Sequence, residues 1–464
     1  MNDSLKSTMA TIGIALLAVL VVAVGIYLGT TLHPSKKGVT NIRWVVDPSP
    51  IREETIALFE KSHPGIEVTN DIDSGLQRLL TQLAGDVPPD VMAAYDAESL
   101  YTFFKYGLLL DLTPYIKKYN IPVDKFYPEL HDYMYCRERD KQGNPIGEEK
   151  LVGIPENVCS LNLFYNKTVF DEHNRTAAPG DRVEYPTSDW TWDDMFAAAD
   201  KLTKYKEVNG RKIAIQKGLY VMETPFIFVW MYGGHVYSPD GQTCVINEEA
   251  AKKGMRYWET LRMKAKVIPS ASEAASLDSS GGWGGEQLLF AKGKVAMLIT
   301  GRYMVTAFRQ NYKNLDFGIA RFPKAPCPNN LLLSKSYCIP ATSKNRDQAI
   351  KFIVHLTSTA NQNLVADYGD GVPSMNTPEI IQNFLYNPDY PKETENQNVL
   401  DDLAGAKPQE RSLYISSTDF NQIWGLEVGK VWLGQQDMDT ACDKIAKRVN
   451  EIIHRNMNNP NFVN

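Results

Sequence analysis

The segment Leu288–Tyr303, LLFAKGKVAMLITGRY, contains a helix end, a buried strand and a possible ligand-binding edge in close succession. Gly293 supplies the left-handed conformation that lets a helix end without a Cβ clash. The apolar run Val295–Ile299 that follows is too short for an ordinary helix and predicts a strand covered on both faces. Arg302 and Tyr303 come at the end of this strand, where open α/β sheets present side chains to ligands. The segment therefore predicts an α/β fold and makes Arg302 and Tyr303 candidate ligand-binding residues.

The bulk composition limits the classes of protein to which the chain can belong. Its 464 residues are enough for two or three domains, and 43% hydrophobic with 22% charged residues is ordinary globular composition. The formal net charge is −6, and Lys and Arg form no run longer than a pair or triplet, so we expect no nucleic-acid partner. The chain has no C-x-x-C motif and no two His at helical i, i+4 spacing, so we expect no metal and no cofactor.

The N-terminal region has the composition of a membrane segment. Residues 9–32 contain no charged side chain and are rich in Ile, Leu, Val and Ala. This stretch is long enough to span a bilayer, and it exceeds the apolar core of a cleavable signal, which is about 7–15 residues. The only A-x-A-like site, Ala23–Gly25, is followed by more apolar residues, which favours an uncleaved anchor. We therefore expect a cytoplasmic N-terminus over residues 1–8, a transmembrane anchor over 9–32 and a polar tether over 33–40.

Six cysteines occur in the chain, all of them after the predicted anchor. In an oxidising compartment they could form disulfides, and Cys327 with Cys338 is the pair that we would test first. The alternative is that all six are buried thiols that behave as small hydrophobic side chains. The sequence does not decide between the two.

Several blocks of the sequence carry the motifs of one known family in the order in which that family has them. The motif F-x-x-G-K-x-A-M begins at Phe290, and comparable blocks cover residues 88–116, 153–170, 191–203 and 352–375. In these blocks, which include a Y-N-K and a T-W-D-D motif, the chain resembles the extracellular solute-binding proteins of ABC importers. The resemblance is to the sugar-binding group that includes maltose-binding protein, and it covers most of the chain after about residue 40.

The resemblance implies a periplasmic-binding-protein-like fold, in which two α/β lobes are joined by a hinge of crossing segments and enclose a cleft. Lobe 1 is then expected to comprise residues 41–156 and 317–362, and lobe 2 residues 157–316 and 363–464. The resemblance also implies a bacterial cell envelope, with the lobes on the periplasmic or extracellular face of the cytoplasmic membrane. ABC permease subunits are the implied protein partners.

Four candidate site residues come from the first lobe and the hinge. Asp47 follows the predicted strand 41–46, at an edge where polar ligands bind, although an aspartate before a proline can equally form a turn or a cap. Tyr95 and Asp96 follow another predicted strand, in a loop that supplies ligand partners in the family, but Asp96 can also cap the next helix. Asn157 lies in the implied hinge crossing, and its amide can both donate and accept hydrogen bonds.

The second lobe supplies the other candidates. Glu223 and Phe226 lie at the start of an aromatic helix that begins with a Thr-Pro pair. Trp283 is flanked by glycines in a Ser/Gly loop, so it could stack on a sugar ring, contact the other lobe or contact a partner protein. Tyr368 and Asp370 belong to a turn that is constrained by glycine and proline and resembles the late cleft loop of the family.

The favoured function is a non-catalytic receptor for a sugar or oligosaccharide, which binds between two lobes that close on it. Aromatic residues such as Tyr303 and Tyr368 would cover the apolar faces of the sugar, and carboxylates and amides would bind its hydroxyls. Two alternatives stay open: an extracellular carbohydrate-active hydrolase, because glycosidases also place carboxylates in an aromatic cleft, and a receptor of the same fold for a non-sugar solute. No G-x-S-x-G or H-E-x-x-H motif supports the hydrolase.

Overall fold

The computed structural model describes residues 38–72, 76–85, 88–140, 143–270, 272–274 and 285–459. The predicted anchor over 9–32, the residues before it and most of the predicted tether lie outside these ranges, as does Trp283. Within the described ranges, no helix combines the length and the apolar character that crossing a bilayer requires.

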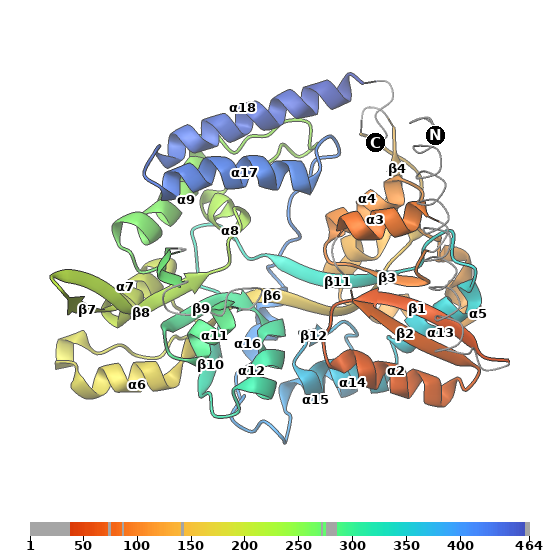
Figure 1. Ribbon diagram of the computed structural model, residues 1–464, viewed down its shortest axis with the longest axis horizontal. Helices are drawn as coiled ribbons and strands as arrows, with labels where there is room; N and C mark the ends of the chain where they lie inside the picture. The colour runs from red at the N-terminus through yellow and green to blue at the C-terminus, as the bar shows by residue number, and fades with distance from the viewer. Residues whose placement is uncertain are drawn as a thin grey trace, which may run out of the picture.

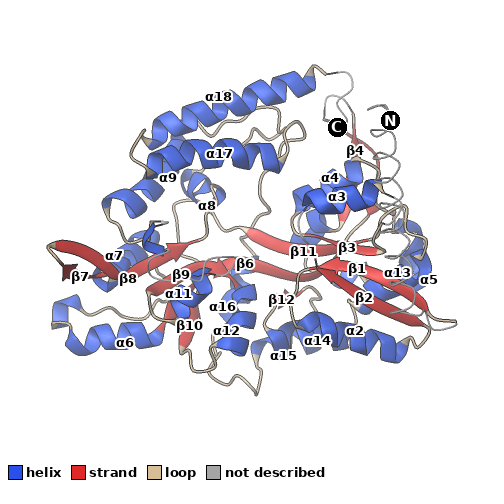
Figure 2. Cartoon of the chain, viewed as in Figure 1, coloured by secondary structure: helices blue, strands red, loops and turns tan. Residues whose placement is uncertain are grey.

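One sheet runs through the whole molecule and contains ten of the described strands (Figure 2). They are β1 (Thr40–Val46), β2 (Ile66–Ile72), β3 (Val91–Ala94), β6 (Ile154–Asn166), β7 (Lys204–Val208), β8 (Arg211–Val221), β9 (Val295–Gly301), β10 (Phe317–Ala320), β11 (Leu332–Cys338) and β12 (Val372–Pro373). The order along the sheet is β2-β1-β3-β11-β6-β9-β8-β7, and β10 and β12 pair with β6 beside this path. A separate hairpin of β4 (Tyr135–Arg139) and β5 (Pro145–Leu151) projects from the first half.

The strand β6 joins the two halves of the molecule, and every one of its residues is buried. Its first part pairs with β11 and β12, which belong with the parallel strands β1, β2 and β3. Its second part, Leu161–Asn166, pairs with β9 and β10. The predicted hinge crossing is therefore the centre of the sheet, and any movement of one half against the other must act through it.

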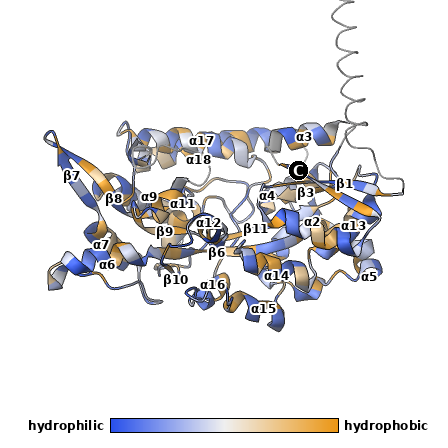
Figure 3. Cartoon of the chain, turned by 60° about the horizontal axis from the view of Figure 1, so that its bottom comes forward, coloured by the Kyte–Doolittle hydropathy of each residue, from blue (hydrophilic) through white to orange (hydrophobic). Residues whose placement is uncertain are grey.

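Helices cover the sheet on both sides (Figure 1). Hydrophilic and hydrophobic residues alternate along these helices (Figure 3), as expected for a helix that packs one face on the sheet and turns the other to solvent. The first half carries α2 (Ile51–Ser62), α3 (Leu76–Ala84), α4 (Ala97–Lys105), α5 (Ile116–Tyr119), α13 (Arg346–His355), α14 (Thr359–Tyr368) and α15 (Pro378–Leu385). The second half carries α6 (Lys167–Thr176), α7 (Trp192–Leu202), α8 (Phe226–Val229), α9 (Glu249–Glu259), α11 (Gly285–Ala291), α12 (Val305–Asn311), α16 (Asn396–Leu403), α17 (Ser417–Trp432) and α18 (Met438–Met457).

Stacked aromatic rings hold the helices of the second half together. Trp258 of α9 is buried and stacks on Phe228 of α8, with ring centroids 4.8 Å apart. Trp258 also stacks on Trp424 of α17, with ring centroids 5.9 Å apart. Such rings bury large apolar areas, so this column accounts for the close packing of α8, α9 and α17.

The predicted division into lobes needs correction at two places. The segment from residue 317 was expected in the first lobe, but β10 pairs with Leu163–Asn166 in the second half. The predicted boundary at residue 362 falls inside α14, which packs on the first half and bonds to α2 through Thr55 and Asn361, 2.8 Å apart. A short apolar run predicts a strand, but long-range register decides which half the strand joins.

Of the two alternatives that the sequence leaves open for the cysteines, the structure has the thiols and not a Cys327–Cys338 disulfide, because all six cysteines are free. Five of them are buried, and Cys327 is half-buried. Cys338 lies inside β11, and its thiol faces the carbonyl oxygen of Met92 at 3.5 Å. Burial raises the pKa of the Cys338 thiol well above its usual value, so this side chain behaves as a small hydrophobic one.

A segment before α17 makes a second connection between the halves. Glu410 fixes it to the second half, because its carboxylate accepts from Trp230 Nε1 at 2.6 Å and from the backbone N–H of Val236 at 2.6 Å. The same segment then reaches α4 in the first half, where the backbone N–H of Ser417 donates to Glu98 at 2.6 Å. Glu98 thus binds the N-terminus of α17 across the molecule.

We predict that Glu98 makes the stability of the protein fall as the pH rises. Burial, and then the nearby Asp96, raise the pKa of Glu98 from 4.5 to about 7. The folded state therefore holds a proton that the unfolded state releases, so the free energy of unfolding should decrease between about pH 4.5 and pH 7. Glu98→Gln, whose amide oxygen can still accept from Ser417, should remove that part of the decrease in urea titrations across this pH range. Glu53→Gln, in the exposed first turn of α2, is the control. An unchanged pH slope in Glu98→Gln would contradict the prediction.

Candidate functional site

A cavity of about 500 Å³ lies where the two halves of the sheet meet. The first half contributes the loop after β1 and Tyr95 after β3, and the crossing strands β6 and β11 contribute residues between the halves. The second half contributes Met222 after β8, Gln287 of α11 and one face of α12. Residues far apart in the sequence therefore enclose one space at the carboxyl ends of β1 and β3, where open α/β sheets bind ligands.

Five of the predicted site residues line this cavity: Asp47, Tyr95, Asn157, Tyr303 and Asp370. Tyr95 is 40% exposed, whereas Asn157 and Asp370 are nearly buried. The amide of Asn157 donates to the carbonyl oxygen of Asp370 at 2.5 Å, which ties the loop after α14 to the crossing strand. The structure thus brings together residues that the sequence places in five separate segments.

Three other candidates have structural roles away from the cavity. Asp96 is the N-cap of α4, where its side chain accepts from the backbone N–H of Ser99 at 2.6 Å. Glu223 points to solvent and forms an ion pair with Arg262. Phe226 is 6% exposed and packs in the core of the second half. The prediction that these three side chains face the cleft is not met in this structure.

Arg302 and Tyr368 also lie outside the cavity. Arg302 is fully buried, and its Nη2 atom is 2.9 Å from the Glu393 carboxylate, so it holds the loop after α15 rather than facing a ligand. Tyr368 lies at the surface, where its hydroxyl donates to Glu54 of α2. Trp283, the remaining candidate, lies outside the described residues.

The position of Tyr303 depends on the glycine two residues before it. A Cβ atom at Gly301 would lie 2.5 Å from the Tyr303 ring, which is closer than real Cβ contacts come. Glycine therefore lets the ring fold back over the end of β9 and reach the cavity wall. Thr300 donates to the Tyr303 hydroxyl at 3.3 Å, which fixes the ring from the other end.

Sequence reasoning missed a buried ion pair behind the cavity. Arg52 of α2 and Glu156 of β6 are both fully buried, and Arg52 Nη1 lies 2.7 Å from each oxygen of the Glu156 carboxylate. Burial alone would lower the pKa of Arg52, but Glu156 raises it well above its usual value. Burial alone would likewise raise the pKa of Glu156, but Arg52 and then Lys335 lower it. Both groups are therefore charged, and each needs the other.

Lys335 of β11 extends this pair into a cluster that reaches the cavity. Its Nζ atom lies 3.2 Å from a carboxylate oxygen of each of Asp47, Glu156 and Asp370. Despite burial, which acts in the opposite direction, Lys335 and Arg52 lower the pKa of Asp47 well below its usual value. Burial, and to a smaller extent the nearby Glu156 and Asp47 carboxylates, raise the pKa of Asp370, although Lys335 and Arg52 act in the opposite direction.

Two signals in the sequence could have revealed this cluster. Arg52 lies on the buried face of α2 together with Thr55 and Phe59, at helical spacing. Lys335 interrupts a strand that is otherwise apolar or small. A charged residue on a buried face requires a partner, so both positions predict buried ion pairs.

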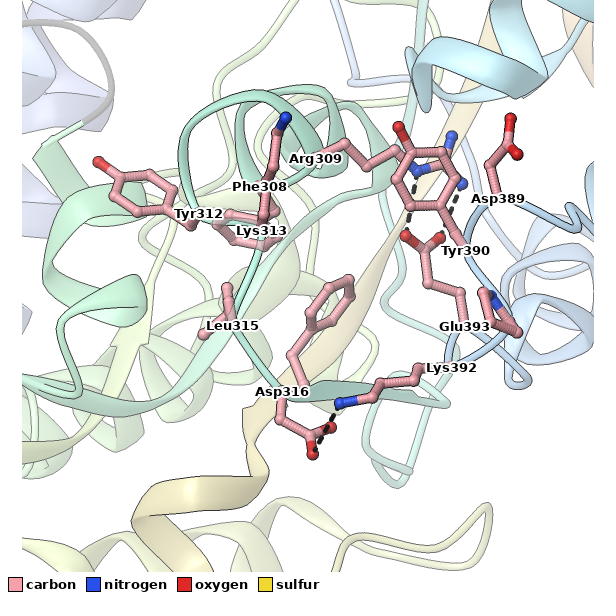
Figure 4. Close-up of a pocket in the computed structure, with 12 residues that line it drawn as sticks. Phe308, Arg309, Tyr312, Lys313, Leu315, Asp316, Asp389, Tyr390, Lys392 and Glu393 are labelled. Atoms are coloured by element: carbon pink, nitrogen blue, oxygen red, sulfur yellow. Dashed lines mark hydrogen bonds and ion pairs between the residues drawn. The ribbon is translucent and has the colours of Figure 1, made fainter.

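A second cavity, of about 480 Å³, lies on another side of α12, and charged residues that line it pair with one another (Figure 4). Arg309 there donates to both oxygens of Glu393, at 3.0 and 2.8 Å, and its guanidinium lies 4.0 Å from the centre of the Tyr390 ring. Glu393 is also the partner of Arg302. These groups bind one another, so the cavity between the halves is the better candidate site.

Among the residues described, no group of three or more His, Cys, Asp or Glu could hold a metal ion.

The chain matches known proteins that share this architecture. Residues 45–363 match the family model of the bacterial extracellular solute-binding proteins, and the chain belongs to this family. It is 25% identical over 350 residues to the galactooligosaccharide-binding protein of Bacillus subtilis, which covers 71% of this chain and 72% of that protein.

Solved structures show the same fold. An ABC substrate-binding protein of Listeria monocytogenes in complex with cycloalternan has a TM-score of 0.75 at 21% identity, covering 90% of this chain and 99% of that chain. A Mycobacterium tuberculosis protein in complex with glycerophosphocholine has a TM-score of 0.70 at 17% identity, covering 90% of this chain and 99% of that one.

These comparisons confirm the predicted resemblance and the periplasmic-binding-protein-like α/β fold. The chain is an extracellular solute-binding protein by family, and this is a family of binding proteins and not of enzymes. The alternative of a carbohydrate-active hydrolase is therefore set aside.

We predict that Arg52→Met will destabilise the protein by about 3–5 kcal/mol, because it leaves the Glu156 carboxylate buried without its main partner. Arg43→Met is the matched control. Arg43 pairs with Asp71 at 2.7 Å near the surface, with side chains 27% and 36% exposed, so its loss should cost no more than about 1 kcal/mol. Urea unfolding followed by tryptophan fluorescence measures both values. If the two variants lose the same free energy of unfolding, the buried pair does not stabilise the protein more than the surface pair does, and the prediction is wrong.

Proposed function

We propose that this protein is the solute receptor of an ABC-type carbohydrate importer, and that it binds a sugar or oligosaccharide in the cavity between its two halves. The observation that carries the proposal is the lining of that cavity, which combines Tyr95 and Tyr303 with the polar side chains of Asp47, Asn157 and Asp370. Sugar rings have apolar faces that stack on aromatic rings and hydroxyls that need hydrogen-bond partners. The names of a relative and of a solved structure with this fold also refer to oligosaccharides.

The placement of the lining residues supports binding by closure. Asp47 and Tyr95 belong to the first half, whereas Met222, Gln287 and Tyr303 belong to the second. A solute that contacts both sets binds the closed arrangement more tightly than an open one, so it shifts the population toward closure. In this proposal the closed form is what the permease subunits recognise.

The proposed location is the outer face of the cytoplasmic membrane, periplasmic or extracellular, as the family's description implies. Residues 9–32 would hold the protein there as an uncleaved anchor, on the grounds of their length and apolar composition. Mass spectrometry of the N-terminus of the natural protein tests this part of the proposal, because cleavage within or after this segment would exclude a retained anchor.

The function itself is tested by isothermal titration calorimetry of the purified full-length chain against galacto-, malto- and other oligosaccharides. Stoichiometric binding without product formation supports the proposal. A non-sugar solute is the second candidate, because a structure with the same fold holds glycerophosphocholine. Thermal-shift screening of glycerophosphodiesters and polyamines beside the sugars distinguishes the two candidates.

We predict that Tyr303→Ala weakens binding of the best oligosaccharide in this screen by about 1–2 kcal/mol, which is roughly five- to thirtyfold in Kd. The loss arises from the apolar contact and stacking that the ring provides. Tyr368→Ala is the matched control, because Tyr368 lies at the surface and does not line the cavity. An unchanged affinity for Tyr303→Ala, or an equal loss for both variants, would remove Tyr303 from the proposed site.

A further inference from the structure

We propose that the cavity selects its solutes by charge: it accepts neutral and amino sugars and rejects acidic ones, such as uronates and sugar phosphates. The inference rests on the proposed carbohydrate function and adds the chemical class within it. It follows from which groups of the ionic cluster remain available to a solute.

The cations of the cluster are already paired with carboxylates. Lys335 is the cation that lines the cavity: its Nζ atom donates to Asp47 and Asp370 and forms an ion pair with Glu156, each at 3.2 Å. Arg52 lies behind the cavity, and its Nη atoms donate to Glu156, Asp47 and Asp370 at 2.7 to 3.3 Å. Its Nε atom has no partner among the described residues, but it is fully buried and Arg52 does not line the cavity. An added carboxylate or phosphate would have to break existing ion pairs.

The carboxylates, in contrast, still have free acceptor positions. The Asp47 side chain is 30% exposed and the Asp370 side chain 11%. Asp370 Oδ2 contacts Arg52 and Lys335, while no donor in the described part of the chain reaches Asp370 Oδ1. Each carboxylate oxygen can accept more than one hydrogen bond, so both residues can receive hydroxyl or ammonium donors from a solute.

The charge balance of the cluster points the same way. With every group ionised, the three carboxylates of Asp47, Glu156 and Asp370 exceed the two cations, Arg52 and Lys335, by one negative charge. Asp47 holds its charge, because Lys335 and Arg52 lower its pKa against the effect of burial. In the second half, the buried Arg302 is paired with Glu393 and does not line the cavity. A second negative charge would therefore enter an already negative, partly dehydrated space.

The other polar lining groups carry no positive charge. They are neutral side chains such as Gln287, Thr306 and Gln310. Of the neutral donors on the crossing strands, Asn157 donates to the Asp370 carbonyl oxygen at 2.5 Å, and Ser334 donates to the Asn157 carbonyl oxygen at 2.6 Å. A phosphate or uronate bound here would thus exchange its hydration shell for hydrogen bonds from neutral groups, with no unpaired cation to balance its charge.

The test is a binding panel on the purified full-length chain, with matched neutral, 2-amino and uronate forms of galactose-, glucose- and mannose-based mono- and oligosaccharides. In the best-binding series, we expect the uronate to bind on the order of 100-fold more weakly than the neutral sugar, and the amino sugar to bind at least as well as the neutral one. A uronate or sugar phosphate that binds as tightly as its neutral counterpart overturns the charge selection and leaves the carbohydrate function intact. Failure of every sugar on the panel overturns the carbohydrate function, and this inference with it.

Asp370→Asn connects the selection to the cluster, because it removes the excess negative charge and keeps a similar shape. The preference for neutral over acidic sugar should shrink on the order of tenfold in this variant. Asp347→Asn, in which the replaced side chain is exposed on α13, is the control and should keep the wild-type preference.

If Asp370→Asn does not fold, the ratio of the affinities for the neutral and the acidic sugar is measured on the wild-type protein as the pH is lowered. Protonation of Asp370, whose pKa burial raises, should then reduce the preference. A preference that Asp370→Asn leaves unchanged, or a pH-independent one, would separate it from this cluster and contradict the proposal.

Discussion

The pairing of Arg52 with Glu156 is the interaction on which the arrangement of the cavity depends. It joins the first helix after β1 to the strand that connects the two halves, with both side chains fully buried. Removing either charge would leave the other without compensation in a low-dielectric interior, so the pair constrains α2 and β6 to one relative position. Lys335 attaches the crossing strand β11 to the same pair, and Asp47 attaches the loop after β1. The cavity wall on this side is therefore a single ionic network rather than a set of independent loops.

Much of the fold follows from local sequence signals. The predicted strand 41–46 coincides with β1 to within one residue, and the buried run at Val295–Ile299 forms the beginning of β9. These elements are marked by proline, glycine and apolar periodicity, all of which act within a few residues. The division into lobes was less predictable. β10 and β11 are successive strands in the chain, yet β10 joins the second half while β11 pairs with both β3 and β6. Only pairing between distant segments determines that difference.

The same limit explains which site residues could be predicted. Three residues that follow strand ends line the cavity: Asp47 after β1, Tyr95 after β3 and Tyr303 after β9. They do so because the ends of these strands lie at the edge of the sheet where the cavity opens. The direction of a side chain beyond those loops depends on tertiary partners. Arg302 is adjacent to Tyr303 in sequence but turns toward Glu393, which lies 91 residues later. Phe226 turns into the core for the same reason. Arg52 and Lys335 show the reverse case, in which a charge inside an apolar pattern points to a buried partner that the sequence alone does not identify.

The ionic network also bears on how closure and binding are linked in the proposed receptor. Its charged groups belong to the first half and the crossing strands, whereas the second half contributes the uncharged groups Met222, Gln287 and Tyr303. Closure over an empty cavity would cover Asp47 and Asp370 with side chains that offer few donors, and their lost hydration would oppose it. A solute with several hydroxyls supplies those donors and an apolar face for Tyr303 at the same time. The free energy that favours closure then comes from the solute itself, which is what a receptor needs if its transporter is to respond only to the loaded form.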